Sequence, residues 1–429
     1  MLQRTYVFYS KIFILVFITL ILTLIIPFFS VLSTRADTIP VEKDMSTAIP
    51  EPNIKNEVSA AVLMDANSGQ ILFAFNPDTQ LPIASTTKIM TCLLALEQAP
   101  LDTPVVISEN AVRVEGTRVY LEMGETQNIE NLLYAAMLNS ANDAAIALGE
   151  YLGSGSLESF SIMMNQRALE IGAINTNFVN PTGLSDINHY STAYDIALIA
   201  REAMINPKFR EIAATRTRPW VGEKYQTNLV NLNRLLWSYP GITGIKTGYT
   251  RAAKNCLVAS AEKDGRELIS VILGGGNNIW QQTAELLDYG FKRYVAQTLV
   301  NKGEEVTTIT FPKEHQVGLL ASRSLRVSLP RDKTVNPQSQ IWVKPDLEPP
   351  LAVGEVVGQL TYIVEEQQLE SIPLILAEEV PAYSKRPLLF IAGGLMVATG
   401  ICWHLLERPQ RLYYRRRKIE RRNRKPFIS

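Results

Sequence analysis

The fold of this chain is decided by the stretch Pro82-Ile83-Ala84-Ser85-Thr86-Thr87-Lys88-Ile89-Met90-Thr91, which contains a Ser-x-x-Lys pair. Ser140-Ala141-Asn142 follows after about 55 residues, and Lys246-Thr247-Gly248 after about 105 more. Each motif is common by itself. Together and in this order, they indicate an enzyme in which a lysine, rather than a histidine, activates a serine nucleophile.

The first motif opens a stretch with helical character, which we expect to run from about Ser85 to Gln98. Positions i and i+3 lie on one face of a helix, so Ser85 and Lys88 are expected to be neighbours. A serine hydroxyl needs a base near neutral pH, and a lysine amine serves as one if burial and nearby cations lower its pKa. The alternative is a helix-capping Ser85 beside a solvated Lys88.

Ser140-Ala141-Asn142 lies between two apolar stretches of helical spacing, 132–138 and 144–152, and is therefore expected to form a short turn. In a catalytic role, Ser140 relays a proton to a leaving amine and Asn142 donates to a substrate carbonyl. The alternative is that Asn142 or Asp143 caps the second helix.

Lys246-Thr247-Gly248 is expected on a β-strand, where alternation puts Lys246 and Gly248 on one face and Thr247 on the other. Lys246 offers positive charge, Thr247 a hydroxyl for a carboxylate, and Gly248 room for a substrate backbone. An exposed strand here could also pair with an extended peptide. The alternative is an ordinary polar edge strand.

The rest of the chain predicts two globular domains. The first, residues 57–297, is α+β, because helical stretches dominate 108–240 and strands occur on both sides of them. The second, 300–383, is a small all-β domain without helical periodicity. The expected strands are 60–65, 71–74, 244–250, 256–261, 267–274, 306–311, 356–364 and 371–377, and further helices are expected at 160–171, 193–204 and 281–295.

The formal net charge of +0 hides a strong asymmetry. Residues 407–429 carry ten Arg/Lys and two Glu, a net charge of +8, which favours an anchoring tail over nucleic-acid binding. Two apolar runs, 12–32 and 387–406, predict membrane segments. The first, within residues 1–36, is a signal peptide or an anchor, and a linker of residues 37–56 follows it.

The basic tail after the second apolar run places that tail in the cytoplasm and the two domains outside the membrane. The three cysteines, Cys92, Cys256 and Cys402, form no disulfide framework, and we expect Cys92 and Cys256 to be buried free thiols. The histidines are too few and too scattered for a metal site, and only His189 or His315 could serve a Ser-His-Asp mechanism.

The sequence around the motifs resembles that of the serine-type D-Ala-D-Ala carboxypeptidases, the low-molecular-mass penicillin-binding proteins of peptidase family S11. The resemblance covers about Val58 to Tyr294 and continues weakly into the β-domain. It rests on residues 82–91, Ser140-Ala141-Asn142-Asp143-Ala144-Ala145, Phe178-Val179-Asn180-Pro181-Thr182-Gly183-Leu184, His189-Tyr190-Ser191-Thr192-Ala193 and Gly241-Ile242-Thr243-Gly244-Ile245-Lys246-Thr247-Gly248-Tyr249-Thr250.

The resemblance implies a penicillin-binding, β-lactamase-like transpeptidase domain of antiparallel sheet and helices, then an all-β domain, here with a C-terminal transmembrane helix. It implies removal of the terminal D-alanine from peptidoglycan stem pentapeptides on the bacterial cell membrane, acylation by β-lactams, and neither cofactor nor metal. The roles implied are catalysis by Ser85, Lys88 and Ser140, and substrate binding by Asn142, Lys246, Thr247, Gly248 and Tyr249. The backbone N–H groups of Ser85 and Tyr249 would form the oxyanion hole.

This chain departs from the family pattern at one point of the site. Many relatives carry an arginine for the substrate carboxylate in the segment after the strand that follows Lys-Thr-Gly. Here Asn277-Asn278-Ile279-Trp280-Gln281-Gln282 contains none, which leaves Arg251 and Arg266 as candidate substitutes.

Two other functions fit parts of the pattern. A β-lactamase-like hydrolase needs a further carboxylate after the Ser-x-Asn motif to activate water, and no Glu-x-x-x-Asn stands there. The fate of bound penicillin discriminates between the two enzymes, because a lactamase hydrolyses it fast. A non-catalytic wall-binding module would not require Ser85, Lys88, Ser140 and Lys246 together.

Overall fold

The computed structural model describes residues 49–382. The chain divides into two compact units. Within the described residues, the first comprises 49–304 together with Ala321–Val343 and Gly358–Leu374. The second comprises Glu305–Leu320, Lys344–Val357 and 375–382.

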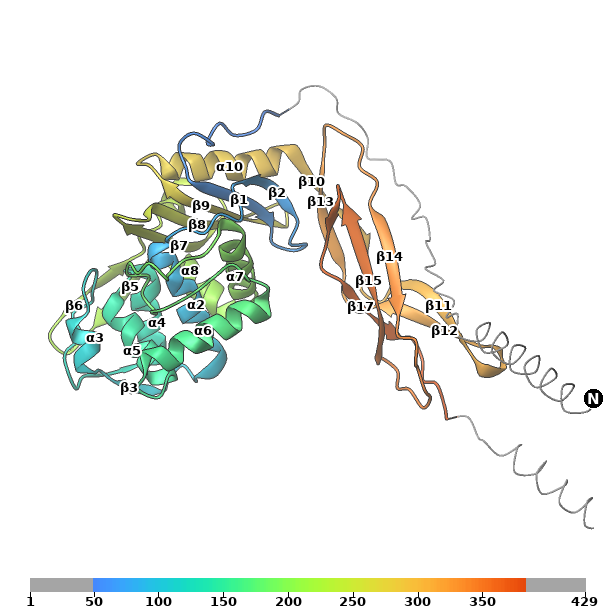
Figure 1. The fold of residues 1–429 in the computed structure, drawn as a ribbon, viewed down its shortest axis with the longest axis horizontal. Coiled ribbons are helices and arrows are strands. Elements are labelled where there is room, and N and C mark those ends of the chain that lie inside the picture. Colours follow the sequence, from blue (N-terminus) through green and yellow to red (C-terminus); the bar gives the residue numbers. More distant parts are fainter. Residues whose placement is uncertain (1–48, 383–429) are drawn as a thin grey trace, which may run out of the picture. The chain divides into compact units, whose positions relative to one another are not determined.

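A five-stranded antiparallel sheet forms the centre of the first unit (Figure 1). Its strands are β1 (Ala60–Asp65), β2 (Ile71–Phe75), β7 (Ile242–Thr250), β8 (Lys254–Lys263) and β9 (Arg266–Gly275), in the order β2-β1-β9-β8-β7. Asp264 and Gly265 have φ of 51° and 67°, the conformation of a tight two-residue turn between β8 and β9. The strand that carries Lys-Thr-Gly, β7, therefore lies at an edge of the sheet.

Helices cover both faces of this sheet. On one face, α10 (Ile279–Arg293) packs on a core that includes Leu257 and Ile272, and on the other face Val258 and Val271 contribute to a larger helical core. The helices of that larger layer are α2 (Lys88–Gln98), α4 (Ile129–Leu138), α5 (Asn142–Leu152), α6 (Leu157–Ile171), α7 (Ala193–Ile205) and α8 (Pro207–Ala214). Shorter helical turns are η1 (Ala84–Thr87), α3 (Glu109–Arg113) and α9 (Leu235–Ser238). The predicted α+β architecture is confirmed.

The segment between α8 and β7 was expected to be helical, and for part of it this prediction is wrong. β5 (Thr217–Val221) and β6 (Gln226–Val230) form an antiparallel hairpin. Each strand buries only one of its large side chains, Trp220 or Leu229, so the alternating pattern is too weak to stand out in the sequence. A second small hairpin, β3 (Pro104–Val106) with β4 (Thr126–Asn128), frames α3.

After α10 the described chain contains strands and one 3₁₀ turn, η2 (Pro312–Glu314), as expected for an all-β domain. The strands are β10 (Tyr294–Val300), β11 (Glu305–Phe311), β12 (His315–Ala321), β13 (Leu325–Pro330), β14 (Gln338–Val343), β15 (Val356–Val364), β16 (Gln367–Gln368) and β17 (Ile372–Leu376). β10 pairs with β13, β11 with β12, and β15 with both β14 and β16. Five of these strands, β10, β12 to β14 and β16, had not been predicted individually.

The predicted membrane segments, 12–32 and 387–406, and the basic tail lie outside the described residues, as does most of the linker. Between residues 49 and 382 no helix has the length and apolar character needed to cross a membrane.

Candidate functional site

Ser85 lies in η1, the 3₁₀ turn that leads directly into α2. Two threonine side chains stabilise this turn through hydrogen bonds to backbone carbonyls three residues earlier. Thr86 Oγ1 donates to the Ile83 carbonyl (2.7 Å) and Thr87 Oγ1 to the Ala84 carbonyl (2.9 Å). Ala84 has a φ of 49°, a conformation that non-glycine residues adopt rarely and mostly at functional sites. The turn thus holds Ser85 in place without using its hydroxyl.

Lys88 is fully buried one turn further on, with its Nζ 3.0 Å from Ser85 Oγ. The same nitrogen lies 2.7 Å from Asn142 Oδ1 and 2.8 Å from the Thr182 carbonyl oxygen. Both of these oxygens can only accept, so a neutral amine gives them its two N–H bonds and turns its lone pair to the Ser85 hydroxyl. The predicted proximity of Ser85 and Lys88 is therefore confirmed.

Burial is the main reason that the Lys88 amine can be neutral. It lowers the pKa of Lys88 well below the ordinary lysine value, and the positive charge of Lys246 lowers it further. Cys92 and Asp143 act in the opposite direction on the Lys88 pKa, and less strongly. This is the electrostatic setting of a general base near neutral pH.

The Ser-x-Asn motif forms the predicted turn between α4 and α5, with Ser140 at a φ of 58°. The capping alternative is wrong for Asn142, because its Oδ1 accepts from Lys88 and its Nδ2 donates to the Glu115 carbonyl (2.6 Å). The Ser140 side chain is 6% exposed. Within residues 49–382 no hydrogen-bond partner is found for its hydroxyl, which leaves that group available.

On β7, Lys246 and Gly248 are buried and Thr247 is half-buried, as the predicted alternation requires. Burial lowers the pKa of Lys246 to about 7, and its Nζ donates to the Thr247 carbonyl (3.1 Å). A Cβ at Gly248 would lie 2.8 Å from the Ser85 backbone nitrogen. The glycine therefore lets the third motif approach the first, and Tyr249, next along the strand, is 65% exposed.

A loop that had no predicted role supports the Lys88 amine. Asn180 Oδ1 accepts from both Thr182 and Gly183, which aims the Thr182 carbonyl at Lys88. A Cβ at Gly183 would lie 1.9 Å from the Ala84 carbonyl oxygen, so the loop packs directly on η1. The Asn-Pro-Thr-Gly sequence indicates a turn here. It does not predict the contact with Lys88, because every residue type has a backbone carbonyl.

Asp143, for which the sequence suggested only a helix cap, is a second supporting residue of the site. It is fully buried, and its carboxylate accepts from the backbone N–H groups of Val119, Leu121 and Ala144 at 3.0–3.2 Å. Burial raises the pKa of Asp143, and these hydrogen bonds oppose that shift. The residue therefore ties the loop before β4 to the start of α5, beside Asn142.

His189 does not act on Ser85. Its Nδ1 accepts from the Val179 N–H (3.2 Å), so its Nε2 carries the proton that is donated to Thr87 Oγ1 (2.8 Å). Burial lowers the pKa of His189 to about 4 and keeps the ring neutral. Its role is to hold η1, which removes the Ser-His-Asp alternative for this histidine. The other candidate, His315, lies 3.3 Å from Glu378 in the second unit.

Of the two candidate substitutes for the missing arginine, Arg266 is excluded by its position. Its guanidinium is buried and donates to the carbonyls of Gly290 and Phe291 at the end of α10. Arg251 is exposed in the turn between β7 and β8. Cys92 and Cys256 are buried free thiols, as predicted.

Residues 45–277 match the family model described as D-alanyl-D-alanine carboxypeptidase, and residues 294–382 match penicillin-binding protein 5, C-terminal domain. The chain is 33% identical to the D-alanyl-D-alanine carboxypeptidase DacF of Bacillus subtilis, over 76% of this chain and 87% of that protein. It is also 33% identical to DacC of Escherichia coli, over 76% and 84%. The crystal structure of penicillin binding protein 5 from Haemophilus influenzae is similar, with a TM-score of 0.65 and 29% identity over 78% of this chain and all of that chain.

Proposed function

Because the chain belongs to the D-alanyl-D-alanine carboxypeptidase family, the serine hydrolases of peptidase family S11, we propose that Ser85 is the nucleophile with which it removes the terminal D-alanine of peptidoglycan stem peptides. Ser85 Oγ attacks the carbonyl carbon of the penultimate D-alanine. The peptide C–N bond breaks, the D-alanine amine leaves with a proton, and water then hydrolyses the ester. The observation that carries this proposal is the buried Lys88 amine, 3.0 Å from Ser85 Oγ, whose two other partners can only accept.

In this mechanism Lys88 takes the Ser85 proton as the ester forms. Ser140 passes a proton to the departing amine, which the availability of its buried hydroxyl supports. Asn142 holds both Lys88 and the loop at Glu115, so it sets the geometry of the base as well as binding the peptide.

The substrate lies along the free edge of β7 as an added strand. Thr247 faces the terminal carboxylate, Lys246 supports the site from the opposite face of the strand, and Gly248 gives the peptide backbone room. The carbonyl oxygen of the scissile bond enters an oxyanion hole made by the N–H groups of Ser85 and Tyr249. The contact between Gly248 and the Ser85 nitrogen supports this arrangement. Each such donor is worth roughly 3–4 kcal/mol in the transition state.

A β-lactam is attacked in the same way, and its ring-opened acyl group remains on Ser85. The two domains extend over residues 57–297 and 300–383, outside the bacterial membrane. The apolar runs 12–32 and 387–406 reach that membrane, the first as a signal or anchor and the second as a span with the tail 407–429 in the cytoplasm. The charge asymmetry between body and tail supports this topology.

Replacement of the nucleophile is the decisive test. Ser85→Ala is expected to lower D-alanine release from a stem pentapeptide by at least about 1000-fold and to abolish covalent labelling by a fluorescent penicillin. The control is Ser270→Ala, which removes a buried hydroxyl that has no protein partner among the described residues. This variant should keep both activities. Full activity in Ser85→Ala would end the assignment.

A further inference from the structure

Thr247 and Lys246 lie on opposite faces of β7, so they do not approach a bound carboxylate from the same side. Thr247 pairs with Leu257, and Leu257 with Ile272, and both of these side chains belong to the core under α10. The Thr247 hydroxyl therefore lies on the α10 face of the sheet, whereas Lys246 points into the opposite, helical core. A carboxylate on Thr247 needs a cation that approaches from the α10 face.

The lysines of the site are poor candidates for that cation. Lys246 is 1% exposed, and burial lowers its pKa to about 7, so near neutral pH much of its population is uncharged. Lys88 is fully buried, and burial lowers its pKa well below the ordinary lysine value, as its role as a base requires. The segment that opens α10, residues 276–282, contains no Arg or Lys of its own.

A cation reaches this segment from another element. The residues before α9 are fixed between α4 and β7, because the Leu232 N–H donates to the Leu138 carbonyl (3.1 Å) and Asn233 Nδ2 donates to the Gly244 carbonyl (2.9 Å). The next residue, Arg234, extends over the indole ring of Trp280, with its Cζ 5.8 Å from the ring centre. Trp280 lies in the first turn of α10.

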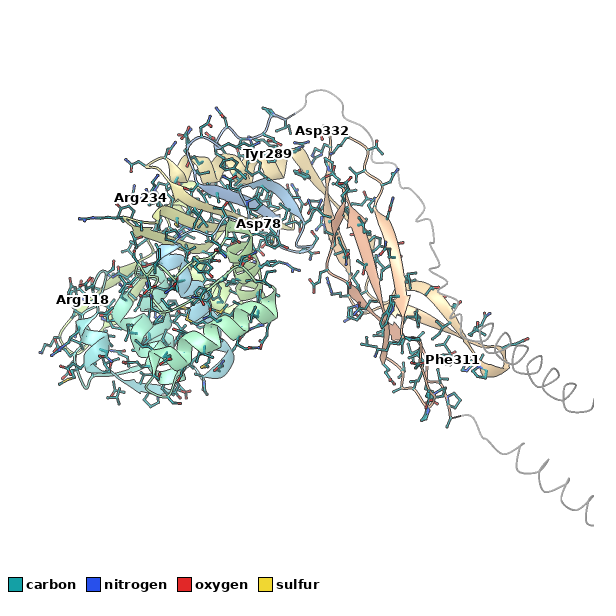
Figure 2. The ribbon with its side chains drawn as sticks, viewed as in Figure 1. Asp78, Arg118, Arg234, Tyr289, Phe311 and Asp332 are labelled. Carbon is teal, nitrogen blue, oxygen red and sulfur yellow. The ribbon has the colours of Figure 1, made fainter. Side chains whose placement is uncertain are left out.

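The Arg234 guanidinium therefore lies on the α10 face of the sheet, the face of the Thr247 hydroxyl, and near the end of the sheet that carries Tyr249. Trp280 packs against the core under α10, the core to which Leu257 and Ile272 belong. α10 begins soon after Gly275, which pairs with Asn255, which in turn pairs with Tyr249. Figure 2 shows Arg234 towards the end of the sheet at which α10 begins.

The Arg234 guanidinium is also free to bind a ligand. The residue is exposed, and no acidic side chain of residues 49–382 forms an ion pair with it. A planar guanidinium that rests on an indole ring is pre-oriented, and it binds a carboxylate through two parallel N–H bonds. We propose that Arg234 binds the terminal carboxylate of the substrate together with Thr247, and so makes the enzyme specific for peptides with a free C-terminus.

The test compares two substrates and rests on the proposed function. An acyl-L-Lys-D-Ala-D-Ala peptide and the same peptide ending in D-alaninamide differ only in the carboxylate. Arg234→Ala is expected to lower kcat/KM for the acid at least tenfold, mainly through KM, and to leave kcat/KM for the amide unchanged. Arg234→Lys should retain part of the preference, because it keeps the charge but not the paired donors.

Arg251→Ala is the rival variant, since Arg251 is the other exposed arginine near the end of β7, and it should keep the full preference for the acid. The proposal is overturned if Arg234→Ala keeps the wild-type ratio of acid to amide, or if Arg251→Ala loses it. Thermal unfolding of each variant checks that the fold is intact.

A second readout separates this inference from the assignment of function. Benzylpenicillin and its methyl ester differ by the same charge, and the rate at which each acylates Ser85 needs no peptide turnover. Arg234→Ala should slow acylation by the acid alone. If the wild-type enzyme cleaved neither peptide, the proposed function would fail, and the two penicillins would still decide the role of Arg234.

Discussion

Lys88 and Lys246 are two buried amines without a carboxylate among their hydrogen-bond partners in the described part of the chain. Burial of an ionisable amine without an anionic partner is unfavourable in folding, and the chain tolerates it twice within one site. This burial lowers the stability of the fold, but it also keeps the Lys88 amine neutral near neutral pH, so that the amine can accept a proton.

Lys246→Met is therefore expected to lose activity and to stabilise the fold by about 1–2 kcal/mol at pH 6. In the folded protein the pKa of Lys246 is about 7, below its unfolded value, so between these two values the unfolded chain binds more protons. Wild-type stability rises with pH through that window, and below pH 7 the penalty is complete. Urea unfolding from pH 6 to pH 10 should show the gap between variant and wild type shrinking as pH rises. A stability difference that does not change with pH would contradict the attribution of the penalty to the lowered pKa of Lys246.

The residues of the site were more predictable than the contacts that support them. Ser85, Lys88, Asn142 and Gly248 were identified from motifs and are brought into contact. The Thr182 carbonyl was not, because any residue type supplies a carbonyl and only the folded loop aims it. The role of Arg234 was also hidden, since its position depends on the packing of α9 against β7 and α10 rather than on spacing.

The loop between α3 and β4 shows how one side chain can order a whole element. Asp143, at the start of α5, accepts from Val119 and Leu121, while the neighbouring Asn142 N–H donates to the Thr117 carbonyl (2.7 Å). Val119 and Leu121 also bury their side chains in the helical core, so these hydrogen bonds and that packing together fix the loop beside the Ser-x-Asn turn.

Asp143→Ala should loosen this loop. It leaves three buried N–H groups unpaired, each at a cost of roughly 1–3 kcal/mol, and it frees the Glu115 end that orients Asn142. We expect lower stability and a kcat reduced about tenfold, with the Ser85 hydroxyl still reactive towards penicillin. Glu109→Ala, which breaks an exposed ion pair with Arg113 in α3, is the matched control and should change neither quantity by a measurable amount. Equal effects in the two variants would argue against a specific role for Asp143.

Elements with strong periodicity were predicted well, and the failures share a physical cause. β7, β8, β9 and α10 were placed within a few residues, because their apolar side chains repeat with one clear period. The hairpin of β5 and β6 was missed because it buries few large side chains. β10 was partly assigned to the preceding helix, because Tyr294 continues the apolar pattern of α10 without a break.

At the scale of the whole molecule, the sequence is informative about what lies beyond residues 49–382. The net charge of zero divides into +8 over residues 407–429, +2 over the first eleven residues and −10 between them. Opposite charges thus gather on the two sides of the predicted membrane segments. Charge and hydropathy alone therefore predict a membrane topology, whereas they carry no information on the order of strands in the sheet.

The predicted topology has a direct test in intact cells. Protease added outside should cleave the β-domain and spare an epitope attached after Ser429, because the tail is then on the cytoplasmic side. Lysed cells serve as the control, in which the epitope must be digested. Loss of the epitope while the cells remain intact would reverse the orientation.

The position of β7 at the end of the strand order has a consequence for handling this protein. An edge strand offers backbone groups to strands from other copies, so the ligand-free site is also a surface at which copies can associate. Asn233 shields it only at Gly244. A slowly released β-lactam that occupies this edge should therefore act as a colloidal stabiliser, keeping concentrated solutions monomeric and free of aggregates.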